Sequence, residues 1–324
     1  MTKRTPTLTM DCIVRSSLLF SIILFSIIGC KNAIRNNDSV SKDIDVVQKT
    51  LNSDIKVTDA VYNTTSSLVV KDVKDLYGYW VGWFEPGKGV LADDDYGIST
   101  GEHTAWDYRN KINISIDSIS GFNVFGHSVV AGNARPFKGS YKNDNGIYTF
   151  DLKEPGDDKY DGAFHFTIAQ NDSVIIGEWN AFGKIKIFKR SYELEKKIFK
   201  YDPTIELDGS SYVDWQKKKG KLDPAYFATT EDAYKYNASK EELTKEKVSN
   251  LKKADLFIIR NSIYARHGFS FKNQQLRAYF DKQDWYIPVH ANIKDAFTEL
   301  EKKNIQLLLR YEKNASEYYD VFGR

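Results

Sequence analysis

The most densely patterned stretch of the chain is residues 254–288, which read ADLFIIRNSIYARHGFSFKNQQLRAYFDKQDWYIP. Leu256, Ile259 and Ile263 recur at spacings of three and four residues, which predicts a helix with one apolar face. Gly268 follows that apolar stripe. It predicts the end of the helix, because glycine readily adopts the left-handed conformation of a helix stop.

The five residues Tyr264-Ala265-Arg266-His267-Gly268 form the last turn and the stop of this predicted helix. We expect Phe269 to fold back onto Tyr264 or Ile263, because an apolar contact commonly accompanies a glycine stop. Local rules of helix termination therefore explain the glycine and partly the phenylalanine, but not the polar residues before them.

Residues 241–314 resemble the YARHG domain, a family named after those five letters. The resemblance implies a small, mainly helical domain that occurs on bacterial envelope proteins and has no agreed biochemical activity. The matching positions are Arg260-Asn261, the five-residue run, Phe271, Leu276, Tyr279-Phe280, Trp285-Tyr286, Pro288 and Glu301-Lys302-Lys303-Asn304-Ile305.

The polar and aromatic side chains around the run have two alternative roles. In the first, the arginines bind a carboxylate or phosphate of a ligand while aromatic rings stack on its sugar or base. In the second, the same groups form a buried hydrogen-bonded network and core. The carbonyl end of a helix repels anions, which favours the second role. Arg260, Tyr264 and His267 share one helix face. The candidate residues are Arg260, Tyr264, Arg266, His267, Trp285 and Tyr286.

The N-terminal sequence predicts a location in the cell envelope. Basic residues precede the apolar run 17–28, which is too short to span a bilayer as a helix (about 20 residues). Ile27-Ile28-Gly29-Cys30 resembles the lipobox of bacterial lipoproteins, in which the cysteine is acylated. We therefore expect a lipoprotein signal peptide over residues 1–29 and a membrane anchor on Cys30, at the periplasmic or the outer surface. The alternative is an uncleaved anchor with an incidental cysteine.

The composition of the mature chain argues against several classes of function. Residues 1–29 hold three of the 46 basic and one of the 44 acidic residues, which leaves 43 of each. This balance argues against general nucleic-acid binding, which relies on basic surface. Cys12 leaves with the signal peptide, so no internal disulfide can form. The chain has five histidines and no cysteine beyond Cys12 and the lipid-carrying Cys30, which does not favour a transition-metal site. We expect no cofactor.

Residues 72–192 read as a β domain. Ile112, Ile114 and Ile116 alternate with polar residues, which is the period of a half-buried strand. About eight such strands joined by short turns predict an antiparallel barrel or a β-sandwich. A barrel of this size holds either a packed core or one small-ligand cavity. The predicted strands are 76–84, 112–116, 122–130, 134–143, 146–153, 164–168, 173–179 and 184–187.

The first predicted strand carries Gly78-Tyr79-Trp80, which resembles the Gly-x-Trp opening of lipocalin-like barrels. The resemblance implies that an arginine at the end of the last strand, here Arg190, packs on Trp80. Later lipocalin signatures are absent, so the similarity concerns architecture alone.

The predicted fold class is α+β, with the β domain followed by a small, mainly helical domain. Ser239 and Glu242 have the spacing of a capping box and predict that the helices begin near residue 241. Later helices are expected over 273–282 and 295–315. The expected segments are a signal peptide at 1–29, a tether at 30–71, the β domain at 72–192, a connector at 193–240, the YARHG domain at 241–314 and a tail at 315–324.

Two further groups of polar residues have alternative interpretations. His127 and Arg135 would line the mouth of a barrel as recognition residues, or would point outward from their strands. The acidic loop 154–162 would bind calcium, or would form a solvated turn. It lacks the carboxylate spacing of the known twelve-residue calcium loop, which favours a turn.

No catalytic motif occurs at diagnostic spacing: phosphate loop, zinc-protease helix, paired cysteines and nucleophile elbow are all missing. We therefore expect a lipid-anchored envelope protein that binds an envelope or extracellular ligand through the barrel, the YARHG domain or both, without catalysis. Two alternatives remain: a hydrolase using Asp and Glu residues, which a converging carboxylate pair would favour, and a purely structural interaction module, which a solid barrel would favour.

Overall fold

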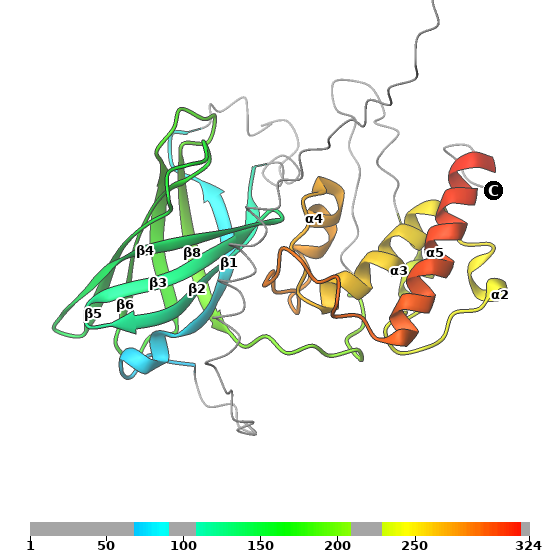
Figure 1. Ribbon diagram of the computed structural model, residues 1–324, viewed down its shortest axis with the longest axis horizontal. Coiled ribbons are helices and arrows are strands. Elements are labelled where there is room, and N and C mark those ends of the chain that lie inside the picture. The colour runs from blue at the N-terminus through cyan, green and yellow to red at the C-terminus, as the bar shows by residue number, and fades with distance from the viewer. Residues whose placement is uncertain (1–67, 91–107, 209–228, 319–324) are drawn as a thin grey trace, which may run out of the picture. The chain divides into compact units, whose positions relative to one another are not determined.

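The structure is a computed structural model that describes residues 68–90, 108–208 and 229–318 (Figure 1). These residues belong to one compact unit. The expected signal peptide, Cys30 and nearly all of the tether lie outside them. None of the helices within the described ranges is long and apolar enough to cross a membrane.

Eight antiparallel strands close into a barrel in which each strand pairs with its neighbours in sequence and β8 pairs with β1. This confirms the predicted barrel and rules out the sandwich. A short 3-10 helix, η1 (Val73–Leu76), leads into it. The strands are β1 (Gly78–Pro86), β2 (Asn110–Ser120), β3 (Asn123–Val130), β4 (Asn133–Asp144), β5 (Ile147–Lys153), β6 (Gly162–Ala169), β7 (Val174–Ala181) and β8 (Lys189–Lys197).

The last strand differs from the prediction. The alternating residues 184–187 precede β8 and form no strand, whereas β8 extends to Lys197, into the segment that was expected to be the connector from residue 193. Its inward residues Tyr192 and Leu194 are buried, and its outward residues are mostly charged. The alternating residues 184–187 therefore did not mark the last strand. The charged outward side chains of β8 hid the strand in the sequence.

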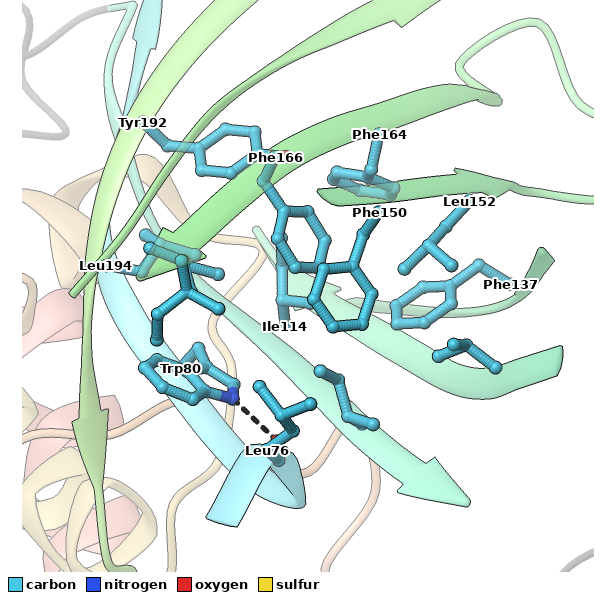
Figure 2. Close-up of a cluster of buried hydrophobic side chains, with 14 of the residues drawn as sticks. Leu76, Trp80, Ile114, Phe137, Phe150, Leu152, Phe164, Phe166, Tyr192 and Leu194 are labelled. Atoms are coloured by element: carbon cyan, nitrogen blue, oxygen red, sulfur yellow. Dashed lines mark hydrogen bonds between the residues drawn. The ribbon is translucent and has the colours of Figure 1, made fainter. Parts of the chain in front are cut away.

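The interior of the barrel is filled with side chains, as Figure 2 shows. Phe150 stacks on Phe166 with ring centroids 4.6 Å apart, and Tyr141 stacks on Phe150 at 5.6 Å. Phe84 packs edge-on against Trp179 at 5.7 Å. These aromatic contacts make the barrel a packed core, the first of the two arrangements that eight strands allow.

The predicted packing of Arg190 on Trp80 is wrong. Arg190 lies at the start of β8 and its guanidinium covers Phe84 at 4.9 Å, while it donates to the carbonyl of Tyr108 at 2.6 Å. Trp80 lies at the other end of the barrel. Its indole N–H donates to the Leu76 carbonyl at 3.0 Å (Figure 2).

A helical region follows the barrel, built around α3, which is buried on several sides. Its start differs from the prediction, because Thr244 rather than Ser239 caps the first α-helix. Leu308 is buried, whereas Leu309 is exposed. The elements are η4 (Glu231–Tyr234), α2 (Lys245–Val248), α3 (Lys253–Arg266), α4 (Gln274–Phe280) and α5 (Glu299–Tyr318).

Candidate functional site

The helix stop at Gly268 has the predicted geometry. Gly268 has φ +68° and donates to the Ala265 carbonyl at 2.9 Å, while Phe269 donates to the Tyr264 carbonyl at 3.1 Å. These two bonds form a Schellman motif. The rings of Phe269 and Tyr264 meet edge-on at 5.9 Å, which confirms the expected apolar contact.

Arg266 is buried and holds the chain that enters from the barrel. Its Nε donates to the Ile205 carbonyl at 2.8 Å, and its Nη1 donates to Ser262 Oγ at 2.8 Å and to Ser239 Oγ at 3.4 Å. Burial lowers the pKa of Arg266 to about 10, so the guanidinium stays charged at neutral pH. The arginine therefore fixes the connector between the two parts of the fold.

His267 is the second residue of the run that contacts the connector. Its ring stacks on Tyr201 with centroids 4.1 Å apart, and its Nε2 donates to Glu301 Oε2 at 2.9 Å. Tyr201 donates to the other Glu301 oxygen at 3.0 Å. Burial raises the pKa of the Glu301 carboxyl, but hydrogen bonds from His267 and the Thr298 amide outweigh burial and lower it to about 2.

The other candidate residues of the helical region also contact protein groups. Arg260 forms a two-pronged ion pair with Glu312, at 2.7 and 3.1 Å. Tyr264 packs between Phe269 and Phe297. Trp285 donates to Gln283 Oε1 at 3.1 Å, and buried Tyr286 donates to the Phe269 carbonyl at 2.7 Å. The structure joins Arg266 and His267 through the connector, and each of the six side chains contacts protein groups within the described ranges.

His127 and Arg135 have separate environments. His127 Nδ1 lies 2.7 Å from Asp117 Oδ2. Arg135 binds the acidic loop, with Nη1 2.5 Å from Asp161 Oδ1 and Nη2 3.2 Å from Asp158. The two candidates therefore do not form one recognition set.

Protein donors surround the carboxylates at the barrel end. Asp161 Oδ2 accepts the backbone N–H groups of residues 156, 157 and 158 at 2.9–3.2 Å. Glu154 accepts from the Gly162 amide at 2.7 Å and from the Trp179 indole at 3.1 Å. Burial raises the pKa of Glu154. Within the described parts of the chain, no cluster of three His, Cys, Asp or Glu residues is arranged to hold a metal ion.

The outer face of β1–β3 packs against the helical region. Val81 of β1 lies in an apolar cluster with Ile287 and Val289. Lys111 donates from its backbone to Asp281 Oδ2 at 3.1 Å and from Nζ to the Gln283 carbonyl at 2.9 Å. This contact buries outward residues of β2 as well as inward ones.

A small, partly open cleft with a cavity volume of about 20 Å³ lies beside this contact. Arg109 stacks its guanidinium over the Trp83 ring at 3.9 Å and lies 3.6 Å from Glu85. From α4, Arg277 lines the opposite side and donates Nη1 to the Lys272 carbonyl at 2.6 Å. The lining residues are Trp83, Arg109, Gln274, Arg277, Ala278, Asp281 and Lys282.

Charge in the cleft is predominantly positive, with two arginines and a lysine against one carboxylate. That carboxylate, Asp281, is buried, and burial raises its pKa to about 7. Burial likewise lowers the pKa of Lys111 to about 8. The sequence patterns missed these residues, although Trp83 alternates with the inward Trp80 and Phe84 and could have been recognised as an outward aromatic.

No curated protein and no solved structure matches the chain. The sequence pattern of one family, described as the YARHG domain, matches residues 232–313. The match begins at η4, upstream of the start expected near 241, and runs into α5. The C-terminal helical region, residues 232–313, is therefore a YARHG domain.

Proposed function

We propose that the protein is a lipid-anchored envelope protein that binds small organic anions, without catalysis, in the cleft between Trp83, Arg109 and Arg277. The envelope address rests on the lipobox-like sequence at Cys30. The YARHG domain supports it, because that domain is typical of extracellular or envelope proteins. The cleft itself is the observation that carries the binding role.

Two other places for a ligand are less favourable. Aromatic rings fill the interior of the barrel, which favours a structural role for the barrel interior itself. Arg266 and His267 direct their polar atoms to the connector, Ser262 and Glu301. The binding role therefore moves to a surface where cationic groups from both parts of the fold converge.

The two arginines suit a carboxylate or a phosphate. A guanidinium donates hydrogen bonds in its own plane, and this fork matches the spacing of two anionic oxygens. Stacking on Trp83 occupies a face of the Arg109 guanidinium, and an anionic ligand would compete with Glu85, 3.6 Å from Nη1, for its N–H edge. The cleft is small, so it fits one anionic group, such as a carboxylate or a phosphate, of a larger ligand.

The nearby carboxylate weakens anion binding only in its ionised form. Burial raises the pKa of Asp281 well above its ordinary value, which favours the neutral acid. The neutral acid removes the one negative charge that lines the cleft.

The ligand class is tested by nuclear magnetic resonance of the tryptophan indole groups. Methyl glucuronide supplies a carboxylate, inorganic phosphate supplies the other anion, and methyl glucoside is the matched neutral sugar. We expect the Trp83 signal, assigned with Trp83→Phe, to shift with an anion and to stay in place with the glucoside. An unmoved Trp83 signal with both anions, or an equal shift with the neutral sugar, would refute the proposal.

The anchor is tested separately with Cys30→Ser. Two or more acyl chains hold a protein stably on a bilayer, whereas one chain is marginal. We expect the variant to lose lipid labelling and lipoprotein-type processing. Labelling that persists would remove the lipid anchor and would leave the cleft unaffected.

A further inference from the structure

One end of the barrel carries three half-exposed aromatic rings. Tyr160 and Phe182 are each 51 % exposed, and Phe188 is 52 % exposed. They lie in the loops that join β5 to β6 and β7 to β8, which open at the same end of an up-and-down barrel. With the lysines Lys159, Lys184 and Lys186 of the same loops, we call this surface the aromatic rim.

Backbone contacts join the two loops into one surface. Phe182 donates to the Asp161 carbonyl at 2.9 Å, and Ala181 donates to the Phe188 carbonyl at 2.8 Å. The backbone at Gly183 packs so closely against Lys159 that an added Cβ would lie 3.0 Å from its carbonyl oxygen. The three aromatic rings are therefore held on a shared, hydrogen-bonded support.

The aromatic rim is positively charged. Lys159 lies over the Tyr160 ring at 4.7 Å, and Lys186 donates to the Tyr108 hydroxyl at 3.0 Å, so both ammonium groups lie beside aromatic side chains. Two exposed carboxylates share the first loop. One of them, Asp158, pairs with Arg135 at 3.2 Å, which leaves Asp157 to oppose the three lysines.

We propose that the aromatic rim contacts the surface of an anionic phospholipid bilayer. Aromatic rings favour the boundary between headgroups and acyl chains, and nearby lysines are attracted to anionic headgroups. The charge of the rim complements such a surface, and an acyl anchor at Cys30 would keep one within reach. The proposal does not depend on the cleft and stands or falls separately from it.

The test uses the mature chain from Lys31, which contains the whole compact unit and no lipid. Co-sedimentation is measured with phosphatidylcholine vesicles, with and without phosphatidylglycerol. We expect binding to the anionic vesicles that weakens with salt, and little binding to the neutral ones. The double variant Phe182→Ser/Phe188→Ser should reduce the partition coefficient about tenfold or more, because it removes apolar groups that would enter the interface.

The barrel provides a matched control. Phe122 and Phe125 are 69 % and 46 % exposed near its opposite end, so Phe122→Ser/Phe125→Ser removes similar rings elsewhere. This control should bind like the unmodified chain. A second variant, Lys159→Glu/Lys184→Glu, should weaken binding to anionic vesicles and reduce its dependence on salt. An equal loss of vesicle binding in both phenylalanine double variants would overturn the proposal. So would a lack of binding to anionic vesicles by the unmodified chain, which would point to a protein or polysaccharide partner.

Discussion

Arg266, in the last turn of α3, donates its Nε–H to the carbonyl oxygen of Ile205 at 2.8 Å. This bond joins the YARHG run to the connector that arrives from β8. His267 makes a second contact with the connector by stacking on Tyr201. The run therefore acts as a clamp on the incoming chain, which gives its two polar residues a structural role.

Arg266→Lys should destabilise the fold although it keeps the charge. An ammonium group lacks the planar fork that reaches Ile205 and Ser262 together, so buried acceptors lose their donors. We expect a loss of about 1–3 kcal/mol in the free energy of unfolding, measured by urea denaturation. Arg310→Lys is the control, because Arg310 is exposed on α5 and its replacement should change the stability by about 0.5 kcal/mol or less. Similar stability of Arg266→Lys and the unmodified chain would contradict the clamp.

Gly268→Val should also destabilise the YARHG domain. Gly268 has φ +68°, which a β-branched residue rarely adopts, and a Cβ there would lie 2.8 Å from a ring carbon of Phe199. We expect a loss of about 1–3 kcal/mol from backbone strain, seen as a lower thermal midpoint. Gly268→Asn should lose less, because asparagine tolerates this backbone region. Equal losses in the two variants would show that crowding, rather than backbone conformation, sets the cost.

Glu301 predicts a specific dependence of stability on pH. Its pKa is lowered to about 2 in the folded protein, so its contribution is present above the ordinary value near 4.5 and is lost as pH falls from there towards 2. Glu301→Gln should destabilise the protein at neutral pH by about 3 kcal/mol, because it leaves His267 without its charged partner. Urea titrations between pH 6 and about 3 should show a shallower acid decline in the variant than in the unmodified chain. Parallel declines would refute this assignment.

The helix stop and the barrel could be predicted from sequence because each follows a local rule. Gly268 ends an apolar stripe, and Ile112, Ile114 and Ile116 alternate as a barrel strand requires. The cleft could not be predicted, because Trp83 and Arg277 meet only where two parts of the fold pack together.

The packing of the helical region on the barrel also buries side chains that the two-residue alternation of a strand would place in solvent. Asn113 points outward from β2, yet it is completely buried. Periodicity describes the two faces of a strand, but it carries no information about what later segments cover them. The pattern at 184–187 also resembled a strand, yet β8 begins after it.

Asn113 is expected to lower the stability of the fold. Neither of its amide atoms has a hydrogen-bond partner among the residues that the structure describes, and its register neighbours are Val81 and Val129. Asn113→Leu has a similar shape and should raise the free energy of unfolding by about 1–3 kcal/mol. Asn113→Asp, which buries a charge, should lower it. Destabilisation by Asn113→Leu in urea denaturation would show that the amide makes a favourable interaction here.

The central claim is that the cleft binds anions through its arginines. The most direct test is the dissociation constant for methyl glucuronide and phosphate, measured by calorimetry on the unmodified chain, Arg277→Gln and Arg310→Gln. Arg310 lies exposed on α5 and does not line the cleft, so both variants remove one positive charge but only one alters the site. We predict that Arg277→Gln weakens the binding of at least one anion about tenfold or more, because a charged hydrogen-bond donor is lost, while Arg310→Gln leaves it nearly unchanged. Equal affinities in all three proteins would contradict the account.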